Sequence, residues 1–259
     1  MKVTRYDLNK GAGLTFAVMT DLHDAPTERI FEKLSALSCD AILIAGDFVH
    51  KKSLKNSPNA LKLLRACPKI APTFISFGNH ERNLVADDER LIRETGVTVL
   101  DDSHVLFKGI YIGGFTSFYM EDSAVKLGDE SAGKTKYRLF KRMKMPSKSC
   151  GLTEYEERTF KWLGDFEKLD GVKILMCHHP EYYPAYLKGK NFGVIVSGHA
   201  HGGQIRLFGH GFFAPDQGFF PKYTRGVYDE NLVVSAGLAY TGGIIPRLFN
   251  PTELVVLKI

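Results

Sequence analysis

Short apolar runs alternate with helical patterns along the first third of the chain. The runs at residues 14–19, 41–45 and 73–77 have the length and hydrophobicity of buried strands, and helical patterns at about 27–37 and 60–66 separate them. This alternation is typical of βαβ units with a parallel sheet. We therefore predict an α/β fold in which these three strands are parallel neighbours.

The remainder of the chain continues as strands and helices without internal repeats or a low-complexity linker. We predict helices at 83–95 and 153–168 and strands at 97–100, 104–107, 110–114, 172–176, 194–197, 232–235 and 253–258. Residues 118–150 have little periodicity and form the best candidate for an inserted cap. A length of 259 residues with 44% hydrophobic content fits a single domain over residues 1–259.

Short polar clusters follow five of the apolar runs. They are TDLHD with Asp21 and His23, AGDFVH with Asp47, GNHE with Asn79 and His80, CHHP with His178, and SGHAHGGQ with His199 and His201. The first three clusters are 26 and 32 residues apart, from positions 21, 47 and 79, close to the ~30 residues of a βαβ unit. The carboxyl ends of parallel neighbours share one sheet edge, so these clusters should converge. Any one of these clusters could be an ordinary helix N-cap or turn, but that interpretation explains the whole series poorly.

Carboxylate, amide oxygen and imidazole are the ligand types of a dinuclear metal site. Asp47 is the candidate bridge, because each carboxylate oxygen can bind one ion while its charge offsets their repulsion. We assign Asp21, His23 and His201 to one ion, and Asn79, His178 and His199 to the other. Water between two cations becomes a hydroxide nucleophile near neutral pH. His80 is then the candidate catalytic residue, either as a general acid or by stabilising charge on the transferring phosphoryl group.

The series DxH, GD, GNHE, HxP and GHxHGGQ, over residues 21–204, resembles the calcineurin-like metallophosphoesterase superfamily. The downstream segments APDQGFFPKYTRGVY, LVVSAGLAYTGG and PRLFNPTELVVL resemble its YkuE/YaeI-like branch. The resemblance implies a four-layer α/β/β/α sandwich of two mixed sheets flanked by helices, with two divalent ions that are manganese, iron or zinc. Two features depart from the pattern: His50 stands where many relatives carry an acid, and the N-terminal membrane anchor of many branch members has no counterpart here.

These residues favour a metal-dependent phosphoesterase that hydrolyses phosphodiester or phosphomonoester bonds with a hydroxide activated by two metals. One alternative is a pyrophosphatase or phosphodiesterase acting on a lipid-linked or nucleotide diphosphate substrate. Another is a catalytically silent metal-binding scaffold. A scaffold should lack a ligand or the proton donor, whereas this sequence has both, so the enzyme is favoured.

Net charge and cysteine content limit which binding partners and which cellular compartment we expect for this protein. A net charge of +5, from 34 basic and 29 acidic residues, is no strong nucleic-acid signal. Residues 131–153 carry seven basic and no acidic side chains, which fits a solvated segment or one that attracts anions. We find no signal peptide, no apolar run near the ~20 residues of a membrane span and no disulfide spacing. We predict a cytoplasmic protein, with peripheral membrane contact left open and no indication of oligomeric state.

Some residues have less definite roles. The Phe-rich stretch 208–223 is interpreted as a loop whose rings cover the core, with an exposed aromatic patch for a lipid or hydrophobic substrate as the alternative. His179 is interpreted as a group that packs beside His178 or supports the ligands from behind. Arg82, Arg225 and Arg247 are possible phosphate clamps, but surface solvation explains them equally well, so they stay outside the predicted site.

Overall fold

The computed structural model describes residues 1–50, 53–116, 154–240 and 245–259, so the predicted cap at 118–150 and the whole basic segment 131–153 lie outside the described residues. The first half contains β1 (Lys2–Asp7), β2 (Thr15–Met19), α1 (Glu28–Ser35), β3 (Ala41–Ala45), α2 (Pro58–Ala66), β4 (Thr73–Ser76), α3 (Ala86–Glu94), β5 (Thr98–Val99), β6 (Ser103–Phe107) and β7 (Ile110–Phe115).

The second half contains α5 (Glu154–Glu167), β8 (Lys173–Cys177), β9 (Val194–Ser197), β10 (Arg206–Leu207), β11 (His210–Gly211), β12 (Phe213–Ala214), β13 (Gly218–Phe219), β14 (Gly226–Tyr228), β15 (Leu232–Val234) and β16 (Glu253–Lys258). Short 3₁₀ turns lie at Cys67–Lys69, Glu81–Asn83 and His201–Gly203, and a π-helical turn lies at Tyr183–Leu187.

Two six-stranded mixed sheets form the centre of the fold. Their strand orders are β1-β16-β2-β3-β4-β5 and β14-β15-β9-β8-β7-β6. The strands β2, β3 and β4 are parallel neighbours, as predicted, and β8 and β9 are parallel neighbours in the second sheet. The C-terminal strand β16 lies antiparallel to β2 and parallel to β1.

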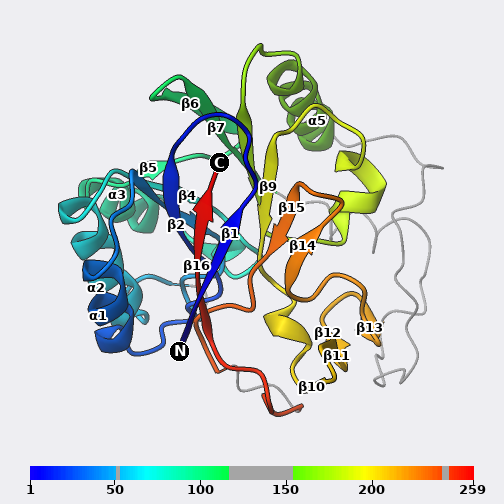
Figure 1. Ribbon diagram of the computed structural model, residues 1–259. Coiled ribbons are helices and arrows are strands. Elements are labelled where there is room, and N and C mark those ends of the chain that lie inside the picture. Colours follow the sequence, from blue (N-terminus) through cyan, green and yellow to red (C-terminus); the bar gives the residue numbers. More distant parts are fainter. Residues whose placement is uncertain (51–52, 117–153, 241–244) are drawn as a thin grey trace.

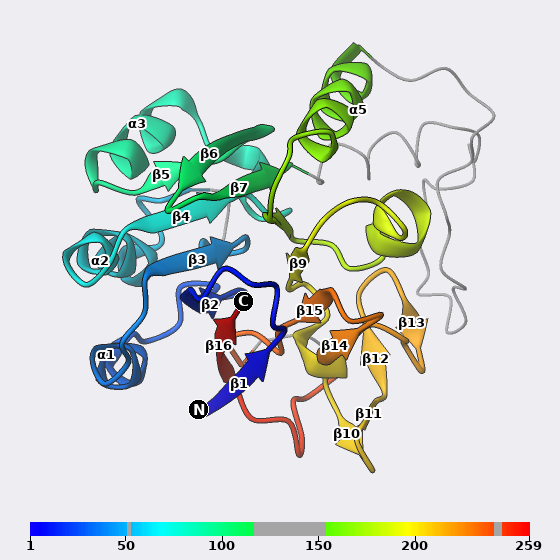
Figure 2. The ribbon, with the colours of Figure 1, turned by 45° about the horizontal axis from the view of Figure 1, so that its top comes forward.

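Side chains of the first sheet alternate between two apolar cores. In β3, Leu43 packs toward the second sheet, whereas Ile42 and Ile44 pack toward the helical layer of α1, α2 and α3. Successive strand residues point to opposite faces, and both faces are covered, so the whole strand reads as an apolar run. Figures 1 and 2 show α1, α2 and α3 on the outer side of this sheet.

The second sheet repeats this arrangement with its own outer layer. Met176 of β8 packs in the core between the sheets, and Leu175 packs outward with Phe166 of α5 and Tyr183 of the π-helical turn. The four layers are therefore helices, sheet, sheet and helices, which confirms the predicted fold class. Within the described helices, none is long and apolar enough to cross a bilayer.

The structure differs from the prediction at the sheet margins. Strand β1 was not predicted, because its residues KVTRYD are polar and partly exposed, as suits an edge strand that pairs only with β16. In the Phe-rich stretch, Tyr223 is buried as the core-covering interpretation requires, but Phe208 is 100% exposed and Phe220 is 79% exposed. That interpretation was therefore wrong for these two phenylalanines.

A buried ion pair ties the two sheets together at the start of β16. Glu253 is fully buried and accepts hydrogen bonds from Thr4 of β1 and from the Ala236 amide, which follows β15, at 2.9 Å. The guanidinium of Arg225 lies 2.7 Å from the same carboxylate. One carboxylate thus joins segments from both sheets.

We expect Glu253→Ala to lower the free energy of unfolding by about 3 kcal/mol, because it leaves the charge of Arg225 without its partner. Urea denaturation measures this change. The matched control is Lys258→Ala, which removes an ion pair between two exposed side chains, Lys258 and Asp7, and should leave the midpoint unchanged. A loss no larger than that of the control would show that the buried pair does not join the sheets.

Candidate metal centre

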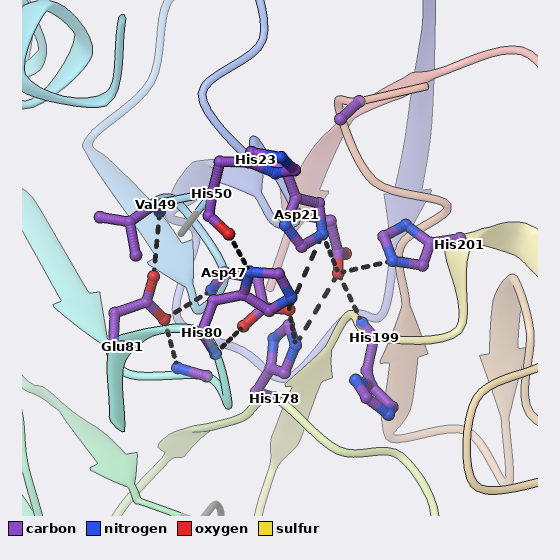
Figure 3. Close-up of polar contacts among 12 residues, drawn as sticks. Asp21, His23, Asp47, Val49, His50, His80, Glu81, His178, His199 and His201 are labelled. Carbon is purple, nitrogen blue, oxygen red and sulfur yellow. Dashed lines mark hydrogen bonds and ion pairs between the residues drawn. The ribbon is translucent and has the colours of Figure 1, made fainter. Parts of the chain in front are cut away.

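The predicted site residues gather where the carboxyl ends of both sheets meet. Asp21, Asp47 and His80 come from the loops after β2, β3 and β4 of the first sheet, while His178 and His199 follow β8 and β9 of the second. Figure 3 shows the side chains of Asp21, Asp47, His80 and His178 gathered with those of His23 and His201, and the backbone N–H of His199 directed at Asp21. The convergence predicted for one sheet edge therefore extends across the sandwich.

Several of these residues hold an unusual backbone conformation. Positive φ angles occur at Asp21 (53°), His23 (44°), Asp47 (54°), His199 (63°) and His201 (45°). Non-glycine residues adopt this region infrequently, and it costs of order 1–3 kcal/mol at each position. Backbone hydrogen bonds hold the loops in place, from Asp21 N–H to the Gly46 carbonyl at 3.1 Å and from His23 N–H to the Asp47 carbonyl at 3.0 Å. These five residues keep a strained backbone conformation, which indicates that the positions of their side chains are important enough to offset that conformational cost.

Asp47 lies at the centre of the cluster. Its Oδ2 is 3.2 Å from His178 Nε2, 3.7 Å from His23 Nε2 and 3.9 Å from His80 Nε2. Asp21 Oδ1 is 3.8 Å from Nε2 of both His178 and His201. Two atoms that each lie ~2.1 Å from a shared ion are roughly 3–3.4 Å apart, so these separations are close to those of ligands around cations.

The candidate ligand atoms fall into overlapping groups around Asp21 and Asp47. Asp21, His23 and His201 form one group, and Asp47, His178 and His199 form another, with the ligand atoms of each group within 4.8 Å of one another. Two further groups overlap them, His23 with Asp47 and His80, and His179 with Glu181 and His199, so the division between two ions stays a prediction. Asn79 lies beside them, between Gly78 and His80 on the loop after β4.

Buried polar atoms test whether this cluster suits metal ions. Among the residues that the structure describes, Asp21 Oδ2, both ring nitrogens of His23, Asn79 Oδ1, His178 Nε2 and His201 Nδ1 are buried without a hydrogen-bond partner. Such atoms cost free energy unless something else satisfies them. Other buried atoms of the described residues, such as Trp162 Nε1 and Thr27 Oγ1, are also unpaired. The atoms named above belong to predicted ligands that lie close together, so the donor set fits divalent cations.

Burial and charge set the protonation of the histidines. Burial lowers the pKa of His23 to about 4 and that of His201 to about 3, against the attraction of Asp47 and Asp21, so both imidazoles are neutral at pH 7. For His178, burial opposes protonation, but the ion pair with Asp47 raises the pKa to about 9. The pKa of Asp47 stays well below its usual value: burial would raise it, but the nearby charge of His178 prevails. His178 would have to lose this proton to serve as a metal ligand.

Hydrogen bonds to the outer ring nitrogens aim two histidines at the cluster. The Nδ1 of His178 lies 2.8 Å from the Ala45 carbonyl, which directs Nε2 toward Asp47. The Nδ1 of His80 lies 2.7 Å from the His50 carbonyl, and its backbone N–H donates to Asp47 Oδ1 at 2.9 Å. With 33% of its side chain exposed, His80 borders solvent, unlike the buried His178. At His50, the main-chain oxygen rather than the side chain orients His80.

Two glycines allow the carboxylates their close approach. A Cβ at Gly78 would overlap Asp47 Oδ1, and one at Gly198 would lie 2.5 Å from Asp21 Oδ2 and 2.7 Å from Thr20 Cβ. Neither separation is tolerated between real atoms, so any side chain would displace the carboxylates. Steric contact with the carboxylates therefore explains why the GNHE and SGHAHGG motifs have glycine at these two positions.

Glu81 is a supporting residue that the sequence analysis missed. Its carboxylate is buried and accepts hydrogen bonds from the backbone N–H groups of Asp47 at 2.8 Å, Gly78 at 2.7 Å and Val49 at 3.1 Å. It therefore joins the loops after β3 and β4 (Figure 3). Burial, with the nearby charge of Asp47, raises its pKa to about 7. The only sequence signal was an acid beside the predicted catalytic histidine.

The structure separates the three arginines considered as phosphate clamps. Arg225 binds Glu253, and the guanidinium of Arg247 donates to the carbonyls of Asn250 at 2.6 Å, Ala239 at 3.1 Å and Pro251 at 3.0 Å. Surface solvation was therefore the wrong explanation for these two, which stabilise the fold. Arg82 is exposed.

His179 is fully buried, as its packing role predicted, and its ring centroid lies 4.4 Å from that of His199. Two further carboxylates, Glu181 and Asp216, reach the ring of His199 and were also missed. His104 and His210 are both exposed, although His104 stacks on Phe166.

A four-layer sandwich with Asp and His clusters at the strand ends defines the metallophosphoesterase class. The sequence model of the calcineurin-like phosphoesterase family matches residues 14–203, and the chain belongs to this metal-dependent family. The family assignment and the superfamily resemblance inferred from the motifs therefore agree.

Curated relatives share this class. Metallophosphoesterase YkoQ of Bacillus subtilis is 24% identical over 72% of this chain and 60% of its own length. Metallophosphoesterase Cj0846 of Campylobacter jejuni is 25% identical over 92% of this chain and 55% of its own. Phosphodiesterase YaeI of Escherichia coli is 24% identical over 65% of this chain and 51% of its own. The chain thus spans little more than half the length of these relatives.

We expect Glu81→Gln to destabilise the metal-free protein by about 2 kcal/mol, since an amide nitrogen cannot accept the N–H bonds that the carboxylate accepts. Chemical denaturation in the presence of a chelator measures the effect. Glu94→Gln, at a side chain that is 62% exposed on α3, is the matched control and should be neutral. Equal stability of the two variants would contradict the anchoring role of Glu81.

Proposed function

We propose that this chain is a phosphoesterase that hydrolyses phosphodiester or phosphomonoester bonds with a pair of divalent ions. The observation that carries the proposal is the set of buried, unsatisfied oxygen and nitrogen atoms at the meeting point of the two sheets. Membership of a metal-dependent hydrolase family supports the same reaction class. The whole protein's activity is part of this proposal.

In the proposed centre, Asp47 would be the ligand shared by the two ions. Asp21, His23 and His201 complete the first position, and Asn79, His178 and His199 complete the second. The distances from Asp47 Oδ2 to His23 and to His178, 3.7 and 3.2 Å, support a bridging role because one carboxylate faces ligands of both ions. Mixed oxygen and nitrogen donors suit manganese, iron or zinc. When bound, the ions lower the pKa of water and offset charge on the phosphate oxygens.

The chain's own residues supply orientation and proton transfer. Asp21 and Asp47 are fixed by backbone donors, from His199 N–H to Asp21 at 2.9 Å and from His80 N–H to Asp47 at 2.9 Å. His80 presents Nε2 toward the cluster from the solvent side, which suits a group that protonates a departing alkoxide or stabilises charge on the phosphoryl group. His80 is therefore the proposed catalytic residue.

Small phosphate esters are the proposed substrate class, and the name of the relative YaeI favours diesters. A lipid-linked or nucleotide diphosphate is the second candidate, and the exposed Phe208 and Phe220 favour its lipid-linked form because aromatic rings can contact an acyl chain. A metal-binding scaffold without turnover is the contrasting hypothesis. The free thiols of Cys39 and Cys67 are typical of a reducing compartment and support a cytoplasmic location.

Purified protein loaded with manganese should hydrolyse bis(p-nitrophenyl) phosphate, lose activity on chelation and recover it when manganese is restored. Elemental analysis should give two ions per chain. The parallel substrates p-nitrophenyl phosphate and a lipid-linked diphosphate separate the substrate classes. Metal binding without hydrolysis of any of them would favour the scaffold, and absence of metal binding would contradict the proposed centre.

Replacing His80 with Ala should reduce kcat about 10²- to 10⁴-fold while the metal content stays unchanged, because proton transfer is lost but the ligands remain. Steady-state kinetics with elemental analysis of the same preparation measures both quantities. His104→Ala, at an exposed histidine on the edge strand β6, is the matched control and should retain activity. Loss of metal from the His80 variant would reassign this residue as a ligand.

A further inference from the structure

His199 faces two carboxylates that the proposed metal positions do not use. Its Nε2 lies 2.9 Å from Asp216 Oδ2 and 3.6 Å from Glu181 Oε1. Glu181 lies in the turn after β8, and Asp216 lies between β12 and β13. Both carboxylates therefore reach the imidazole from segments other than β9, which positions His199 itself.

The burial of Glu181 makes this contact significant. Its side chain is 10% exposed, and both carboxylate oxygens are buried without a hydrogen-bond partner in the described part of the chain. A carboxylate removed from water needs a compensating positive or N–H group. One such group is Nε2 of His199 at 3.6 Å, and the ring of His179 lies close to the same carboxylate.

We propose that Glu181 and Asp216 are positioning residues that hold the Nε2–H of His199, so that Nδ1 is the atom this imidazole offers to the metals. The inference rests on the proposed function, in which His199 is a ligand. A neutral imidazole carries one N–H group, and a carboxylate on that side fixes the tautomer and the ring rotation and makes the other nitrogen a better donor.

His178 provides an internal comparison. Its Nδ1 faces the Ala45 carbonyl, and its Nε2 faces Asp47. The two neighbouring histidines thus use opposite nitrogens, and in each the outer partner determines which one. The partner of His178 is a neutral carbonyl, whereas the partners of His199 are carboxylates, so His199 should be the stronger donor of the pair.

The proposal is tested by titrating manganese into the metal-free protein and measuring its binding by calorimetry. In the double variant Glu181→Ala with Asp216→Ala, we expect the dissociation constant of the ion assigned to His199 to rise about 10- to 100-fold, with the melting temperature of the metal-free protein unchanged. Glu181→Gln and Asp216→Asn retain a carbonyl oxygen that can accept the N–H bond, so they should recover most of the affinity. Glu230→Gln, at an exposed carboxylate between β14 and β15, is the matched control.

A double-mutant cycle with His199→Ala separates positioning from a general structural effect. If Glu181 acts through His199, Glu181→Ala causes no further loss of manganese affinity once His199 is absent. An equal loss in both backgrounds would overturn the proposal. So would a third manganese ion in the wild type that Glu181→Ala removes, because the carboxylates would then form a cation site of their own.

The outcomes also distinguish this inference from the proposed function. If the wild-type protein binds no manganese, the proposed function fails. If it binds two ions and the double Ala variant binds them equally tightly, the proposed function stands and only the positioning role is overturned.

Discussion

The burial of two carboxylates, Asp21 and Asp47, between the ends of two sheets is the constraint on which the site depends. Both side chains are almost completely removed from solvent, so their charges need compensation from within the molecule. Histidines from both sheets and backbone N–H groups provide part of it. Several buried oxygen and nitrogen atoms of the clustered residues are left without a hydrogen-bond partner, and a cation centre is the physical explanation of that group of atoms.

The fold brings the two carboxylates together at the expense of local conformational strain. Left-handed backbone at Asp21, Asp47 and His199 and close contacts at Gly78 and Gly198 bring the side chains together at a conformational cost. The sandwich offsets that cost with cores on both faces of each sheet and with buried anchors such as Glu81 and Glu253. Stability and site geometry are thus supplied by different parts of the same strands.

The sequence predicted the strands around the site well, because parallel strands covered on both faces leave uninterrupted apolar runs. Their order then followed from the spacing of Asp21, Asp47 and Asn79. The edge strand β1 gave no such signal, since it is polar and pairs with a strand from the other end of the chain. The sequence analysis missed Glu81, Glu181 and Asp216. Their roles depend on the backbone amide or imidazole that each contacts after folding, and the local sequence pattern does not indicate those contacts.

The most direct measurement is a crystal structure of the manganese-loaded protein with anomalous diffraction. The account predicts two anomalous peaks about 3.5–4 Å apart, with Asp47 between them, Asp21, His23 and His201 around one, and Asn79, His178 and His199 around the other. A single peak, or peaks away from Asp47, would contradict the dinuclear centre.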